Sequence, residues 1–265
     1  MQPVIRAALA AAAIAAPPSA QAADLRAKPV YKGPPPVLVY NWTGCYIGAQ
    51  LGAQWRTWTA AVAYPTVAPV VAASRDFSSD GPLLYGGQIG CNWQPAGSRF
   101  LVGVEGDVAG LSDNSFQREV FRFAVPATDH FDATGKLGTQ ASLRLRLGVT
   151  FDRFMLYVAS GVSWARVSAS TLLVRDGVGG FEAALSDTRS GWNVGVGGEF
   201  ASAGNWTAGL EYRFTDYGSF NYNAPAGTFP FAFAAFGASA DHIRTQDIRV
   251  RFNYLFNNAP IVARY

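Results

Sequence analysis

The residues best suited to chemistry in this sequence are charged side chains, most of which recur two positions apart. Eight of them form four pairs: Glu105 with Asp107, Arg144 with Arg146, Glu211 with Arg213, and Arg249 with Arg251. The ninth, Glu199, stands alone. Residues two apart lie on the same face of a β-strand, so each pair projects to one side. Four acids and five bases gathered in one interior would form either a salt-bridged plug or a narrow, charge-selective ion path.

Both histidines of the chain directly follow an aspartate, at Asp129-His130 and Asp241-His242. An Asp–His pair is half of a hydrolase's catalytic machinery, which also needs a positioned nucleophile. No recognisable motif nearby supplies one, and two isolated histidines are weak evidence for a metal site. The sequence therefore predicts no enzyme, no metal and no cofactor. A barrel hydrolase would require activity that is lost when His130 or His242 is replaced.

The elements that must position the charges are β-strands, as the stretch Ala141–Trp164 shows. From Leu143 to Phe151 apolar residues alternate with polar ones, which is the period of a strand with one apolar face. Asp152-Arg153 makes a minimal turn, and a second apolar series returns. A helix would place Arg144 and Leu147 on the same side and mix the two faces, so a hairpin is predicted.

The same alternation predicts eight strands, joined alternately by long and short connections. The other six are Trp42–Trp55, Leu83–Gln94, Phe100–Leu111, Gly191–Ala201, Trp206–Asp216 and Ile243–Phe256, and the long loops are Arg56–Pro82, Ser112–Leu137, Arg166–Arg189 and Tyr217–His242. Long loops on one rim and short turns on the other are the rule for outer-membrane barrels, and neither a lipocalin nor a sandwich obeys it. We therefore predict an all-β, eight-stranded antiparallel up-and-down transmembrane β-barrel, with long extracellular loops and short periplasmic turns.

In this barrel the charged positions face the lumen and the apolar positions face lipid. An eight-stranded barrel is just wide enough for side chains to fill it, which favours the plug over the ion path. Aromatic residues near both strand ends predict two interfacial girdles. These include Trp42, Trp93, Trp206 and Phe256 at the short-turn rim, and Trp55, Tyr85, Trp164 and Trp192 at the long-loop rim.

The chain is divided into four predicted segments. Met1–Ala22 has Arg6, an apolar run and an Ala-Gln-Ala cleavage site, so residues 1–22 are expected to be a cleaved signal peptide. Residues 23–41 form a proline-rich periplasmic linker, residues 42–256 the barrel, and residues 257–265 a C-terminal extension. A net charge of +3 with 15% charged residues is not the footprint of a nucleic-acid-binding protein.

Cys45 and Cys91 are the only cysteines, in a chain expected to reach an oxidising compartment. Both lie on the outward face of adjacent predicted strands, close to the periplasmic rim, which makes a cross-strand disulfide feasible. The alternative is two free thiols facing lipid. The compartment favours the disulfide.

Several short stretches resemble the small outer-membrane β-barrel family of alphaproteobacteria, the porin-like surface-antigen group related in shape to OmpA and OmpX. They are Trp42–Gly48, Gly86–Trp93, Gly103–Asp107, Arg144–Gly148 with Leu156-Tyr157, Trp192–Glu199 and Glu211-Tyr212. The resemblance implies a cell outer-membrane location and a barrel, without one defined transport activity. Its members include porins, structural proteins and host-interaction antigens.

The expected function is a structural or surface-interaction role with at most weak pore activity; the alternative is a small-solute or ion porin with a charged lumen. The expected partners are outer-membrane lipid and lipopolysaccharide. Residues 60–73 and 224–240 are apolar and nearly uncharged. They are either surfaces for adhesion and self-association or strands that extend above the membrane, and the second interpretation is preferred.

Overall fold

The protein is described by a computed structural model over residues 38–63, 72–79, 81–113, 115–122, 130–175, 178–202, 204–224, 236–256 and 261–262. The predicted signal peptide (residues 1–22) and most of the predicted linker (residues 23–41) lie outside these residues. In the described part of the chain, no helix is long and apolar enough to span a membrane.

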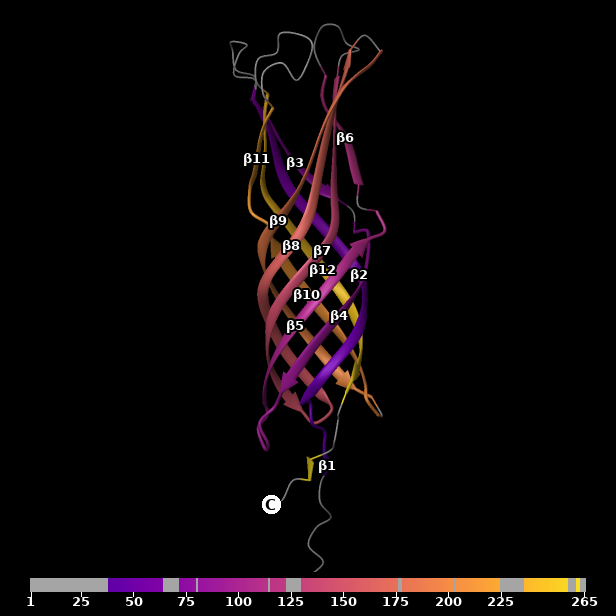
Figure 1. Ribbon diagram of the computed structural model, residues 1–265, viewed down its shortest axis with the longest axis vertical. Helices are drawn as coiled ribbons and strands as arrows, with labels where there is room; N and C mark the ends of the chain where they lie inside the picture. The colour runs from indigo at the N-terminus through magenta and orange to yellow at the C-terminus, as the bar shows by residue number, and fades with distance from the viewer. Residues whose placement is uncertain are drawn as a thin grey trace, which may run out of the picture. The chain divides into compact units, whose positions relative to one another are not determined.

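Eight strands form a closed antiparallel barrel (Figure 1). Neighbours along the chain are neighbours in the wall, and the last strand pairs with the first, with Leu255 opposite Tyr46. The strands are β2 (Gly44–Ala63), β4 (Leu83–Trp93), β5 (Phe100–Leu111), β7 (His130–Phe151), β8 (Phe154–Arg175), β9 (Val178–Ala201), β10 (Trp206–Asp216) and β12 (Phe236–Leu255). The predicted fold class is confirmed.

The alternation of residues along each strand separates two faces. Ile89 and Leu145 project outward and are 63% and 65% exposed, whereas Arg144 and Arg146 beside Leu145 are buried. This is the reverse of a soluble protein, and it suits a wall whose outer side contacts hydrocarbon. The charged residues therefore have only the lumen in which to find partners.

Five strands of the barrel are much longer than the sequence predicts, so the predicted bounds of the long loops are wrong; one of the five is β12, which begins at Phe236 and not at Ile243. β2 continues to Ala63, β8 runs to Arg175, and β7 and β9 begin at His130 and Val178. Three shorter strands extend the wall further: β3 (Ala72–Ser79) beside β2, β6 (Ser115–Arg122) beside β7, and β11 (Phe220–Ala224) beside β12. The prediction ended each strand where apolar alternation ended, but backbone pairing continues above the lipid, where the outer face no longer needs to be apolar.

The two ends of the described chain also pair. In the predicted C-terminal extension, β13 (Ile261–Val262) pairs antiparallel with β1 (Leu38–Val39). Of the predicted apolar loops 60–73 and 224–240, residues 60–63, 72–73, 224 and 236–240 are strand, and the rest lie outside the described residues.

Trp42 does not belong to the lipid-facing girdle that the sequence predicts. Its side chain is 1% exposed, its indole N–H donates to the carbonyl of Asp152 at 3.0 Å, and its backbone N–H donates to Gln94 at 3.0 Å. Trp206 begins a strand with almost the same sequence, yet it is 57% exposed. The difference follows strand parity: Trp42 is in phase with the inward residues Tyr46 and Gln50, whereas Trp206 is in phase with the outward residue Leu210.

Close approach of strands β7 and β8 depends on Gly161. A Cβ at this position would collide with the carbonyl oxygen of Leu143 and would lie 2.7 Å from the Cα of Arg144. We expect Gly161→Ala to lower the free energy of unfolding by about 3 kcal/mol, because only a backbone shift relieves the overlap. The measurement is urea unfolding of the refolded protein in lipid vesicles, followed by tryptophan fluorescence.

Gly106→Ala is the matched control, because a Cβ there would meet its nearest atom, the carbonyl oxygen of Ser142, at an ordinary 3.7 Å. We expect this variant to stay within about 0.5 kcal/mol of the wild type. Equal unfolding midpoints for the two variants would contradict the proposed crowding.

Candidate functional site

Strand register places opposite charges next to each other inside the barrel. Glu105 of β5 is opposite Arg144 of β7, and Glu211 of β10 is opposite Arg249 of β12. All nine charged residues that the sequence singled out point into the lumen, and none is more than 6% exposed. The candidate site is therefore the interior of the barrel.

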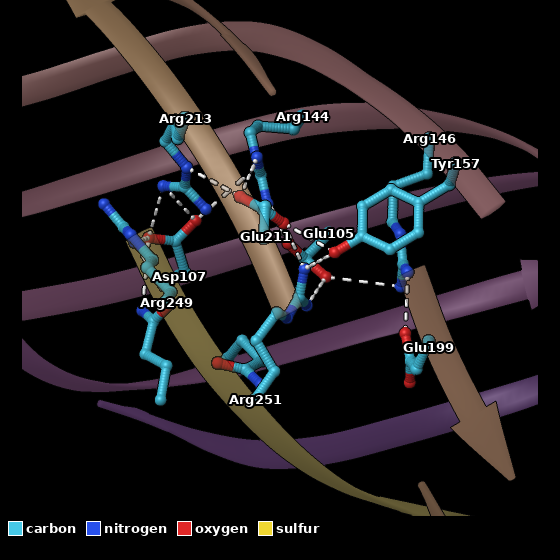
Figure 2. A network of polar contacts seen from close by, with 12 residues as sticks. Glu105, Asp107, Arg144, Arg146, Tyr157, Glu199, Glu211, Arg213, Arg249 and Arg251 are labelled. Atoms are coloured by element: carbon cyan, nitrogen blue, oxygen red, sulfur yellow. Dashed lines mark hydrogen bonds and ion pairs between the residues drawn. The ribbon is translucent and has the colours of Figure 1, made fainter. Parts of the chain in front are cut away.

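Glu105 lies at the centre of this interior (Figure 2). Its two carboxylate oxygens pair with Arg144 and Arg251, and the Nη1 of Arg146 lies 3.4 Å away. The hydroxyl of Tyr46 donates to it at 2.5 Å. Three guanidinium groups thus surround one fully buried carboxylate.

Glu211 forms a second centre that shares arginines with the first. It is bound by Arg144 at 2.8 Å, Arg213 at 3.0 Å and Arg251 at 2.5 Å, and it accepts a hydrogen bond from Tyr157 at 2.8 Å. Arg144 and Arg251 each bridge the two glutamates. The two centres therefore form one connected network, and removing any member would leave several charges without a partner.

Asp107 and Asp247 continue the network on one side of these centres. Asp107 binds Arg213 at 3.0 Å and Arg249 at 3.2 Å, and Asp247 binds Arg249 at 2.6 Å. Sequence analysis missed Asp247, although it precedes Arg249 by two residues and so has the same parity. The alternation of the last predicted strand, Ile243–Phe256, was traced only from Ile248 onward. Asp247, one residue earlier, was therefore not assigned to the inward face.

On the other side, Glu199 binds Arg146 at 2.8 Å and accepts hydrogen bonds from Thr207 and Asn253. With Asp247 included, five carboxylates meet five guanidinium groups in what we call the lumenal charge network. Its members are Glu105, Asp107, Glu199, Glu211, Asp247, Arg144, Arg146, Arg213, Arg249 and Arg251. Because each carboxylate is held by at least one arginine, none is placed to act as a base on a substrate.

Two tyrosines belong to the network and were missed by a search for charges alone. The guanidinium of Arg146 lies over the ring of Tyr157 at 4.0 Å and over that of Tyr46 at 5.5 Å. Each tyrosine is opposite a glycine on the next strand, Tyr46 opposite Gly90 and Tyr157 opposite Gly197. An inward tyrosine opposite an inward glycine is the sequence signal that would have found them.

Apolar clusters lie inside the barrel on both sides of the charges. Toward the short turns, Trp42 packs with Leu101, Met155, Tyr157, Ala159 and Ala201. Toward the long strands, Leu84, Ala109, Leu111, Leu137, Ala165, Tyr217 and Ile243 form a second cluster. The sequence analysis assigned charged residues to the lumen and did not identify these inward apolar residues.

The histidines do not assemble a catalytic or metal site in the described part of the chain. His242 is exposed, and its Nδ1 lies 3.5 Å from Asp216, which also binds Arg244 at 3.1 Å. The side chains of Asp129, His130 and Asp241 lie outside the described residues. Among the residues that are described, no group of three His, Cys, Asp or Glu side chains could hold a metal ion.

Cys45 and Cys91 lie directly opposite each other on β2 and β4 and are joined by a disulfide. Both residues are on the outward face of the barrel. The bond closes a loop with a sequence separation of 46 residues and staples two strands that are already paired.

Comparison with known proteins agrees with this architecture. Residues 7–256 match the family described as outer membrane protein beta-barrel domain. The 25 kDa outer-membrane immunogenic protein of Brucella abortus is 29% identical over 226 residues, which cover 84% of each chain. The 22 kDa outer membrane protein of Rhizobium leguminosarum is 31% identical over 157 residues, covering 58% of this chain and 63% of that protein. The structure of OprG from Pseudomonas aeruginosa covers 82% of this chain and 98% of its own, with 11% identity and a TM-score of 0.49.

Proposed function

The chain belongs to the outer membrane protein beta-barrel domain family, and from this premise we propose that it is a closed barrel with a structural and surface-interaction role. It is an outer-membrane protein, as its alphaproteobacterial relatives are by name. The family leaves open whether such a barrel conducts ions. The proposal of a closed lumen therefore depends on the packing inside this chain.

The observation that carries the proposal is the complete burial of the charge network. The side chains of Arg144, Glu105 and Glu211 have no exposed surface. In a water-filled pore the lining charges are hydrated, because removing an ion from water costs several kcal/mol unless it is paired. Charges that are this closely paired support a plug.

The apolar clusters at both ends of the lumen support the same proposal. An ion that enters from the short-turn side would first meet Trp42, which is anchored to Asp152 and Gln94 by hydrogen bonds. It would then have to separate Arg146 from Glu199. Each barrier removes hydration from the ion, so we expect no conducting path in the resting barrel.

Planar-bilayer recording of the refolded mature protein tests the proposal. We expect no discrete conductance steps from the wild type or from Arg146→Ala, with insertion shown by protection from protease. Arg99→Ala, on an exposed residue of a short turn, is the control for charge removal outside the lumen. Reproducible steps whose ion selectivity changes in Arg146→Ala but not in Arg99→Ala would establish the alternative, a charged-lumen porin.

The surface-interaction part of the proposal is supported by the strands that extend beyond the apolar band. The relatives named immunogenic are consistent with an exposed outer surface. Self-association through residues 60–73 and 224–240 is supported by their apolar sequence alone. We propose no catalytic activity, since the described carboxylates of the lumen are committed to arginines.

A further inference from the structure

The outer wall changes from apolar to polar at one level across strands β7, β8 and β9. On β8 the outward residues Val162 and Trp164 are followed by Arg166 and Ser168. Trp164 is opposite Ser190 of β9, the outward residue next above Trp192. Aromatic residues mark the membrane interface, so the next row of outward side chains lies at the depth of lipid headgroups.

Four side chains just above this boundary form what we call the β7–β9 basic patch: Lys136, Arg166, Ser168 and Ser186. Lys136, Ser168 and Ser186 are directly opposite one another across β7, β8 and β9. The Nε of Arg166 donates to Ser186 at 3.2 Å, and the hydroxyls of Ser168 and Ser186 are 3.0 Å apart. Two cations thus flank a pair of hydroxyl groups on one small area of the wall.

A β-bulge between Leu137 and Gln140 provides the space for Arg166. A Cβ at Gly138 would lie 3.4 Å from the Cβ of Arg166 and 4.0 Å from its Cγ, so the arginine stem passes over the glycine. Bulges of this kind redirect side chains. The bulge and the bond to Ser186 together position the exposed side chain of Arg166.

The charge of this patch is unbalanced. Within the described residues, the only hydrogen bond of Arg166 goes to a hydroxyl, and neither Arg166 nor Lys136 forms an ion pair with a carboxylate. By contrast, Arg244 at the same rim is paired with Asp216. Guanidinium and ammonium groups next to hydroxyl donors match the phosphate and hydroxyl groups of a phosphorylated sugar.

We propose that the β7–β9 basic patch binds the phosphorylated sugar headgroup of the outer-leaflet glycolipid, lipopolysaccharide. The proposal rests on the outer-membrane location of the barrel and not on its closed lumen, so bilayer conductance does not decide it. The hydroxyls of Ser168 and Ser186 contact the sugar and phosphate oxygens, and Lys136 and Arg166 neutralise the phosphate.

Binding of fluorescently labelled, bis-phosphorylated lipid A to the folded, detergent-solubilised protein tests this inference by fluorescence anisotropy. We expect Lys136→Ala/Arg166→Ala to weaken binding about 30-fold, from the usual contribution of two cations at an anionic lipid surface. Lys136→Arg/Arg166→Lys should stay within about threefold of the wild type, because it keeps the charge. Heat-dependent gel migration verifies that each variant is folded.

Arg99→Ala/Arg153→Ala is the matched control, because it removes two exposed cations from the opposite rim. It should bind like the wild type, and dephosphorylated lipid A and inorganic phosphate should both compete poorly. Equal losses in the two double-alanine variants would show unspecific attraction and overturn the site. Competition by inorganic phosphate as strong as that by lipid A would overturn the glycolipid as its ligand.

Discussion

Replacing Glu105 with glutamine should lower the free energy of unfolding by about 3–5 kcal/mol, the cost of breaking a buried ion pair. Glutamine keeps the size of the side chain but removes its negative charge. Arg146 would still reach Glu199, and Arg144 and Arg251 would still reach Glu211. Arg144 would also keep Asp107 at 3.8 Å. The three guanidinium groups would nevertheless lose the carboxylate that they share while remaining buried, so the folded state loses much of the compensation for their burial.

The measurement is equilibrium unfolding in urea, with the refolded barrel in lipid vesicles and tryptophan fluorescence as the signal. Asp187→Asn is the matched control, because it also neutralises an acid bound to an arginine, at 2.9 Å, but with half of the acid's side chain exposed. Exposed ion pairs contribute about 0–1 kcal/mol. If Glu105→Gln proved no more destabilising than Asp187→Asn, water would have to reach the lumen, and the closed barrel would be wrong.

Removing the disulfide in a Cys45→Ala/Cys91→Ala variant should cost about 2–4 kcal/mol. The bond restricts the unfolded chain by closing a loop with a separation of 46 residues, so the reduced or mutated chain gains conformational freedom on unfolding. The folded barrel should change little, because residues 45 and 91 are held opposite each other by the backbone pairing of β2 and β4.

The test compares the oxidised wild type, the reduced wild type and the double-alanine variant in the same urea titration. We expect the last two to unfold together, at a lower urea concentration than the first. Coincidence of all three curves would contradict a stabilising disulfide. A shift in the alanine variant alone would assign the effect to lost packing of the two side chains and not to the bond.

The period-two pattern of the sequence was enough to predict the fold. Alternation separates the residues of each strand into two faces, and Arg144 and Arg146 identify the polar face at once. The order of long and short connections then distinguishes a membrane barrel from a soluble one. Both properties can be followed along the chain without knowing which distant residues meet, and this is why they could be predicted.

The lengths of the strands and the ends of the lumen could not be predicted in the same way. Strand β8 continues to Arg175 because hydrogen bonds between backbones hold it, and these leave no mark on the sequence once the outer face is free of lipid. Strand parity directs Trp42 inward, but its hydrogen bonds to Gln94 and Asp152 could not be predicted from the pattern. These two hydrogen bonds join Trp42 to residues that are 52 and 110 positions away along the chain.

By itself, the sequence determined which side chains enter the lumen, because parity along a strand assigns each residue to one face. Only the tertiary structure decided which of them meet. Arg251 reaches Glu105 across 146 residues, and Arg144 reaches Glu211 across 67. Such pairs depend on the tilt and stagger of eight strands around a closed wall, which set the height of each residue in the lumen. Alternation gives a side chain its direction but not its height, and so it could not identify the partners.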